Sequence, residues 1–224
     1  GHTNRSGFIV NRMAYHMDIR EADEPGDFLE TFVDQTGASY LLQLYSQSKL
    51  NLTPNLELNA GLHSQYFTLN DNHTLEPRFG LRWKFTSGQA LSVGYGLHSQ
   101  IERLNFYFAR QETPEGTIQP NKNLDFSKAH HLVLSYDRNL TKHLRLKIEP
   151  YYQKLYDIPV IPDSYFSLQN LESEWFFNNS LVNRGEGYNI GVDLNLERFL
   201  HDGYYYLMTV SLFDSKYKGG DGVE

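Results

Sequence analysis

The strongest constraint in this sequence is an alternation of apolar and polar side chains with a period of two. In one segment the apolar members occupy the odd positions Leu75, Pro77, Phe79, Leu81, Trp83 and Phe85. The positions between them are charged or glycine: Glu76, Arg78, Gly80, Arg82 and Lys84. The same alternation recurs at 144–153 and 188–197. Because successive side chains of a strand point to opposite faces, each segment predicts a strand with one apolar and one polar face.

Segments of this kind predict an all-β chain of about nine strands. They are expected near residues 7–20, 38–52, 55–69, 74–86, 89–101, 128–138, 142–156, 186–199 and 203–216. No helical spacing of three and four residues is sustained over three turns. Several segments exceed the five or six residues usual for globular strands and suit tilted strands that cross a membrane. We therefore predict an antiparallel up-and-down meander that forms part of an outer-membrane β-barrel.

The expected connections alternate in length along the chain. Short turns follow every second strand, at 53–54, 86–88, 140–142 and 201–203. The other connections are expected to be long, at 21–37, 102–127 and 157–185, with 70–73 as the short exception. Tight turns on one side and long loops on the other are typical of outer-membrane barrels.

Aromatic side chains lie beside two of the expected short turns. Trp83 and Phe85 precede one of them, and Tyr204, Tyr205 and Tyr206 follow another. Tyr and Trp favour the membrane–water boundary, where the ring is sheltered and the polar tip stays hydrated. Ordinary packing at strand ends is the alternative interpretation.

Charged residues gather on the predicted polar face, including Arg78, Arg82, Lys84, Lys147 and Glu149. A small barrel with a dry interior cannot hold so many charges, because each would lose its hydration without an assured partner. These residues are therefore expected to line a wide, hydrated lumen. They could also form the outer face of a soluble β-sandwich, so a soluble ligand-binding module is the main alternative.

Composition excludes several other classes of protein. The formal net charge is −7, and Lys and Arg are nowhere clustered, so nucleic acid is not an expected partner. There is no cysteine, which removes disulfides and thiolate chemistry. No apolar run approaches the 18 residues of a transmembrane helix. Since bacterial barrels have even strand numbers, nine strands predict that the chain is a fragment.

Several segments resemble the barrel region of TonB-dependent outer-membrane receptors, particularly those of the Bacteroidetes branch. The resembling segments are spread over nearly the whole chain, at 77–83, 94–100, 124–131, 151–160 and 211–219. They are short segments typical of the family, such as Pro-Arg-Phe-Gly-Leu-Arg-Trp, and none is a chemical motif by itself. Their order and spacing carry the resemblance.

The resemblance implies a 22-stranded barrel in the bacterial outer membrane, closed by an N-terminal plug domain that this chain lacks. It further implies active uptake of a nutrient such as a siderophore or a glycan, with energy supplied by the TonB system. The expected partners are outer-membrane lipid, the plug, TonB and a small-molecule or oligosaccharide ligand. The charged lumen residues would then contact the plug or the hydrated lumen.

The sequence predicts no catalytic, cofactor-binding or metal-binding residues. His130 and His131 are adjacent in an expected strand, so they point to opposite faces and cannot readily share one ion. The acidic segment 21–27 lacks the ligand spacing of a calcium loop. A barrel phospholipase that pairs Ser99 with His98 or His63 is a third hypothesis, which no motif favours.

Aromatic residues in the long loops are the candidate ligand contacts. They are Phe106, Tyr107, Phe108, Tyr165, Phe166 and Trp175. Flat rings above a barrel mouth can stack on sugar or aromatic ligands at low entropic cost. The alternative is that these rings pack the loops against one another, because long loops need a core of their own.

Overall fold

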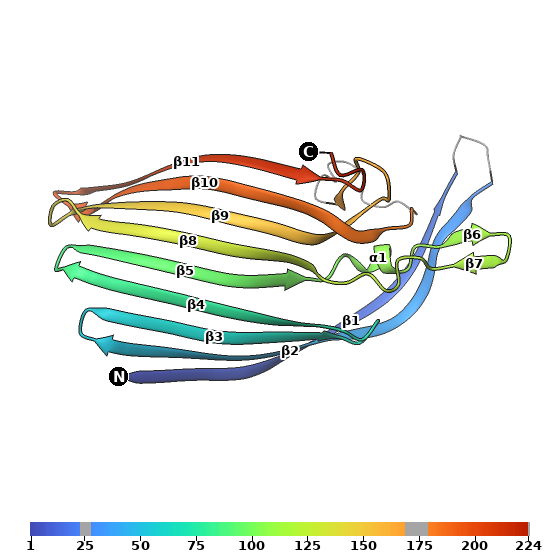
Figure 1. The fold of residues 1–224 in the computed structure, drawn as a ribbon, viewed down its shortest axis with the longest axis horizontal. Coiled ribbons are helices and arrows are strands. Elements are labelled where there is room, and N and C mark those ends of the chain that lie inside the picture. Colours follow the sequence, from blue (N-terminus) through green and yellow to red (C-terminus); the bar gives the residue numbers. More distant parts are fainter. Residues whose placement is uncertain (23–27, 169–178, 224) are drawn as a thin grey trace.

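The computed structural model describes residues 1–22, 28–168 and 179–223, and Figure 1 shows its fold. Nine strands form one sheet in the order β1-β2-β3-β4-β5-β8-β9-β10-β11, and each pairs antiparallel with its neighbours. Their bounds are β1 His2–Glu21, β2 Glu30–Thr53, β3 Leu56–Phe67, β4 Asn72–Thr86, β5 Gln89–Gln100, β8 Ser127–Asn139, β9 Leu144–Val160, β10 Val182–His201 and β11 Tyr204–Lys218. Each of the nine predicted ranges falls on one of these strands. The predicted antiparallel meander is confirmed.

The two faces of the sheet differ as the alternation predicted. Register pairs Leu81 with Val93, and Val93 with Leu134, so apolar side chains form continuous rows across the strands. This apolar face leaves large side chains exposed, among them Leu44, Phe79, Trp83, Leu91, Leu134, Ile190 and Leu212. The opposite, polar face bears Arg78, Arg82 and Lys147. A wide apolar surface without a covering layer suits contact with lipid tails.

The two ends of the sheet differ in their connections (Figure 1). At one end, here called the turn end, two to four residues join β2 to β3, β4 to β5, β8 to β9, and β10 to β11. In the last of these turns Asp202 and Gly203 have φ values of 55° and 83°. Two positive φ values in a two-residue hairpin are typical of a type I′ turn, which favours Asp-Gly. The opposite end, the loop end, carries the connections 22–29, 68–71, 101–126 and 161–181.

The expected loop at 21–37 is largely wrong, because β2 begins at Glu30 and its first residues pair with β1. Val33 lies opposite Ile19, and Thr36 lies opposite His16. Residues 30–37 are mostly polar and do not show the apolar alternation of a membrane-spanning strand. The β1–β2 hairpin therefore extends as a paired ribbon beyond the rest of the sheet (Figure 1).

The loop expected at 157–185 is shorter than predicted, because strand structure occupies both of its ends. β9 continues to Val160, and β10 begins at Val182. The register shifts on both sides of Gly185. A Cβ atom there would lie 2.5 Å from Val160 Cγ1 and 2.9 Å from the Ile158 carbonyl oxygen, so this irregular pairing requires glycine.

The loop expected at 102–127 folds into short elements of its own. It contains α1 (Leu104–Tyr107) and a small hairpin of β6 (Gln111–Thr113) and β7 (Gly116–Ile118). The buried core of the described residues lies here, at the loop end. One cluster consists of Phe67, Tyr107, Leu124, Phe126 and Leu181. A second cluster consists of Val33, Phe108 and Ala109.

Candidate functional site

The polar residues expected to line a lumen all lie on the polar face of the sheet. Arg78, Arg82 and Lys84 alternate along β4, and Lys147 and Glu149 alternate along β9. Short ion pairs connect several of them to their neighbours. Arg82 lies 3.4 Å from Asp137, and Lys147 lies 2.7 Å from Glu149.

A denser polar cluster surrounds Glu76, at the point where β4 and β5 separate. The backbone pairing of these strands runs from Thr86 and Gln89 to Arg78 and Gly96, and ends there although both strands continue. The Glu76 side chain, 1% exposed, occupies the junction. Its carboxylate therefore ties β4 to β5 where backbone hydrogen bonds end.

Every donor to this carboxylate comes from β3, β4 or β5. Gln65 Nε2 donates to Glu76 Oε1 over 2.6 Å, and the Ser99 hydroxyl donates to the same oxygen. His63 Nδ1 lies 2.9 Å from Oε2, and Arg78 Nη2 lies 3.1 Å from it. A buried carboxylate with this many partners is held in one position.

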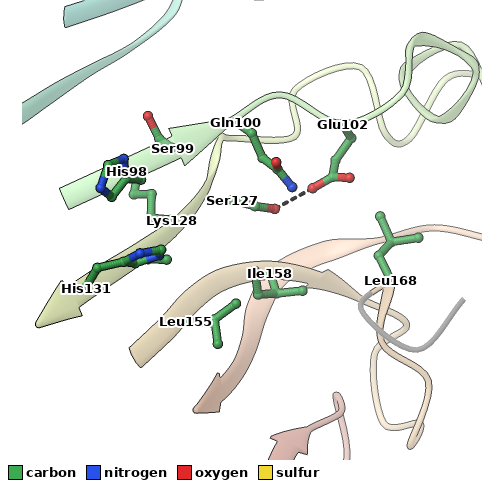
Figure 2. A pocket seen from close by; sticks show the side chains of 11 residues that line it. His98, Ser99, Gln100, Glu102, Ser127, Lys128, His131, Leu155, Ile158 and Leu168 are labelled. Atoms are coloured by element: carbon green, nitrogen blue, oxygen red, sulfur yellow. Dashed lines mark hydrogen bonds between the residues drawn. The ribbon is translucent and has the colours of Figure 1, made fainter. Parts of the chain in front are cut away.

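A cavity of about 420 Å³ opens beside this cluster, between β5, β8 and β9 (Figure 2). Its polar lining includes His98, Gln100 and His131, and Leu155, Ile158 and Leu168 form its apolar part. The volume falls within the range of small-molecule pockets, and the mixed lining suits a ligand with both polar and apolar groups.

The rings of His98 and His131 lie side by side in the cavity wall, with centroids 4.7 Å apart. Register places His131 opposite Gly96, and the His98 ring leans back over that glycine. A Cβ atom at position 96 would lie 2.7 Å from His98 Nε2, so the glycine allows the close approach. Sequence reasoning missed this pair, because only the register of β5 against β8 brings the two positions together.

Glu102 lies at the loop side of the same cavity, beyond the last residue of β5. It accepts a hydrogen bond from the Ser127 hydroxyl (Figure 2). Burial raises the pKa of the Glu102 carboxyl above its ordinary value, although the hydrogen bond from Ser127 opposes this.

Three of the six candidate loop aromatics are buried in the loop core. Phe106, Tyr107 and Phe108 are 2%, 0% and 3% exposed. The Tyr107 ring packs on Phe67 with centroids 5.3 Å apart, and the Phe108 ring packs on Tyr15 at 4.8 Å. The alternative interpretation, that these rings hold the loops together, is therefore favoured for all three.

The remaining loop aromatics lie on the connection between β9 and β10. Tyr165 is 76% exposed and is free to meet a ligand, whereas Phe166 is half-buried. Trp175 lies outside the described residues.

The arrangement around Ser99 does not resemble an activated serine. Its hydroxyl donates to Glu76 and lies 3.0 Å from the Thr74 hydroxyl, and both ring nitrogens of His63 are engaged, with Glu76 and Gln43. The structure thus gives the phospholipase hypothesis no support, since that hypothesis needs a histidine to accept the Ser99 proton and the hydroxyl is hydrogen-bonded to Glu76 instead.

The adjacent histidines lie on opposite faces, as the strand geometry predicted. His130 contacts the Tyr95 hydroxyl on the apolar face, whereas His131 lies beside His98 on the polar face. Across the described ranges, His, Asp and Glu nowhere form a group of three or more that could hold a metal ion. In the same ranges no helix has the length and apolar character needed to span a membrane. The acidic segment considered for calcium lies mostly outside the described residues.

Comparisons with known proteins give one consistent family. The family model described as "TonB dependent receptor-like, beta-barrel" matches residues 3–223. No curated protein sequence matches the chain.

Solved structures show the same fold at low sequence identity. The ferric-catecholate import receptor Fiu of Escherichia coli K12 aligns with a TM-score of 0.70 and 12% identity, over 100% of this chain and 37% of Fiu. The siderophore receptor PirA of Pseudomonas aeruginosa aligns with a TM-score of 0.68 and 13% identity, over 96% of this chain and 40% of PirA. The outer-membrane transporter YddB of E. coli aligns with a TM-score of 0.64 and 14% identity, over 96% of this chain and 30% of YddB. The chain therefore spans well under half the length of these structures.

Proposed function

This chain belongs to the TonB-dependent receptor β-barrel family, and from that premise we propose that it forms part of the wall of an outer-membrane nutrient transporter. The observation that carries the proposal is the contrast between the two faces of one open sheet. One face exposes large apolar side chains to the surroundings, and the other concentrates charges and the polar cluster around Glu76. A barrel wall with lipid outside and a hydrated lumen inside requires this division.

The rest of the transporter follows from the family. We propose a complete barrel of 22 strands, closed by a plug domain and energised by TonB. Arg78, Arg82, Lys84, Lys147 and Glu149 would face the plug or the hydrated lumen as positioning groups. The role is transport, without a catalytic step. We further assign the chain to the Bacteroidetes branch, because its short family-typical segments resemble those of that branch.

The proposed ligand is a small molecule or oligosaccharide, such as a siderophore or a glycan. Relatives of similar fold include a siderophore receptor and a copper transporter, so the fold alone does not select among ligands. We assign ligand contact to exposed Tyr165 and to the cavity bearing His98, His131 and Gln100. These residues lie at the loop end, where a ligand from outside the cell would arrive first.

The experiment that tests the proposal compares single charges placed on the two faces. In the intact protein, Leu134→Arg places a charge among the exposed side chains of the apolar face, and Gln153→Arg places one on the polar face. Leu134→Arg should lower the yield of folded protein in the outer-membrane fraction, because a charge facing lipid costs about 2–4 kcal/mol at mid-membrane. Gln153→Arg should leave that yield close to that of the wild type.

Two results would contradict the proposal. One is recovery of the wild-type protein in the soluble fraction without detergent, which would favour the sandwich module. The other is an equal loss of membrane protein for the two variants.

A further inference from the structure

We propose that the apolar face carries a binding site for an anionic phospholipid of the inner leaflet, at the turn end of the sheet. The inference rests on the proposed membrane-wall function and goes beyond it by naming a lipid class and the residues that select it. Three observations support the site: an apolar groove, a cation without an ion-pair partner among the described residues, and the position of both at the turn end.

The groove crosses β4, β5, β8 and β9 on the apolar face and has a volume of about 550 Å³. Its walls are two rows of side chains that the register places side by side. One row consists of Trp83, Leu91, Tyr136 and Ile148, and the other of Leu81, Val93, Leu134 and Pro150. A groove lined almost entirely by carbon fits an acyl chain, which it can hold by close van der Waals contact.

Arg138 supplies the positive charge beside this groove. It lies two residues beyond Tyr136 on β8, and so on the same face, opposite Gln89 on β5 and Leu146 on β9. Its side chain is exposed and forms no ion pair with any residue of the described ranges. The neighbouring Asp137 does not neutralise it, because Asp137 points to the polar face and binds Arg82 and Arg145.

A second group beside Arg138 is oriented to donate. The Tyr136 hydroxyl donates to Gln89 Oε1 over 2.8 Å, which leaves the Gln89 amide nitrogen free to donate elsewhere. A guanidinium and an amide donor at adjacent positions suit the oxygens of a phosphate group. Together with the groove they match a molecule that has an acyl chain and an anionic head.

Arg198 shows why Arg138 is the cation assigned to the headgroup. Arg198 also lies at the turn end, on β10, but its guanidinium sits 4.2 Å from the Tyr204 ring centroid and 3.8 Å from Asp202. Those contacts leave Arg198 less available to a lipid. The difference distinguishes Arg138 from Arg198 on the apolar face.

The position of the groove selects the leaflet. In outer-membrane barrels the short turns face the periplasm. Trp83 and Tyr136 in the groove wall therefore lie toward the inner boundary of the membrane, where aromatic side chains concentrate. Arg138 and Gln89 lie further toward the turns, at the level of lipid headgroups. We therefore assign the site to a phospholipid of the inner leaflet.

Native mass spectrometry of the intact protein in mild detergent tests the site with two defined lipids. Phosphatidylglycerol and phosphatidylethanolamine with the same acyl chains are titrated separately. Phosphatidylglycerol should bind more tightly, and Arg138→Gln should weaken its binding about fivefold, the effect of one cation near a lipid surface. Val93→Phe should weaken both lipids, because the larger ring fills the groove.

The matched control is Arg12→Gln. Arg12 is an exposed arginine on β1, which β2 and β3 separate from the groove, and its loss should leave phosphatidylglycerol binding unchanged. The inference is overturned if Arg138→Gln and Arg12→Gln have equal effects, or if the two lipids bind equally to the wild type. Failure of the proposed function would look different, since the protein would then be soluble without detergent before any lipid is added.

Discussion

The turn end and the loop end of this sheet are stabilised in different ways. At the turn end, two to four residues close each hairpin, and many large side chains stay exposed. At the loop end, two buried clusters pack loops onto strands, and Glu76 binds β4 to β5 where their backbone pairing stops. The comparison teaches that one continuous sheet can rely on a membrane at one end and on a small water-excluding core at the other.

The largest difference between the ends should come from the removal of a carboxylate at each. Glu76→Ala leaves the Gln65, Ser99 and His63 donors without their shared acceptor, and should lower the free energy of unfolding by about 3–5 kcal/mol. Glu57→Ala, near the turn end, breaks the 2.6 Å pair with Lys49 and a hydrogen bond from Asn59, both accessible to solvent, and should cost about 0–1 kcal/mol. Urea titration of the intact protein in phospholipid vesicles measures both values. Equal losses would remove the distinction between the two ends.

Truncation of an aromatic ring at each end sharpens the comparison. Phe67→Ala empties the centre of the loop core, where the ring is fully buried against Tyr107, and should cost about 3 kcal/mol. Tyr205→Ala removes a ring that is 75% exposed at the turn end, so its effect on unfolding should be clearly smaller. Amide hydrogen exchange at residues 104–109 should be faster in the Phe67→Ala variant than in the wild type. Unchanged exchange there would contradict the assignment of a core to this end.

The turn end should respond instead to changes of backbone conformation. Gly203→Ala places a Cβ atom on a residue with φ of 83°, and should cost about 1 kcal/mol. Gly94→Ala is the matched control, because its φ is ordinary and a Cβ atom there meets nothing within 4 Å. Thermal unfolding in detergent measures the two variants. A Gly203→Ala variant as stable as Gly94→Ala would show that the hairpin turn does not limit stability.

The smallest expected effect is a dependence of the loop end on pH. Burial raises the folded-state pKa of Glu102, so folding favours its protonated form. Its contribution to stability is full below the ordinary carboxyl pKa and is lost as the pH rises through the higher folded-state pKa. The wild type should therefore have a higher Tm at pH 5 than at pH 8, and Glu102→Gln should flatten this difference. Glu112→Gln, on the exposed hairpin of β6 and β7, serves as the control and should leave the pH dependence as in the wild type.

The sheet could be predicted from the sequence because its signal is local. The alternation around Leu81 and Trp83 fixes which side chains share a face, and the turn residues Asp202 and Gly203 mark where a strand reverses. Where that signal is absent the prediction failed. Residues 30–37 lack apolar alternation, yet they form a strand because the hairpin with β1 pairs them.

The site could be predicted only in part, because its geometry depends on contacts between distant segments. Phe106, Tyr107 and Phe108 form an aromatic run in the sequence, but the packing of Phe67 and Tyr15 against two of these rings turns them inward. The pair of His98 and His131 depends on register, which alternation within a single strand does not reveal. The polar wall of β4 was easier to predict, because charge alternates with apolar residues along that strand.

The order of the strands in the sheet also has a consequence for assembly. The strands of the sheet lie side by side in the same order as along the chain. A new hairpin can therefore pair with the edge strand that the previous hairpin left exposed. The entropy lost in closing a loop grows slowly with its length, so even the connection from β5 to β8 adds little to this cost. Such a sheet can grow from one edge, one strand at a time. A defect in one hairpin would then delay every later strand and leave the earlier ones paired.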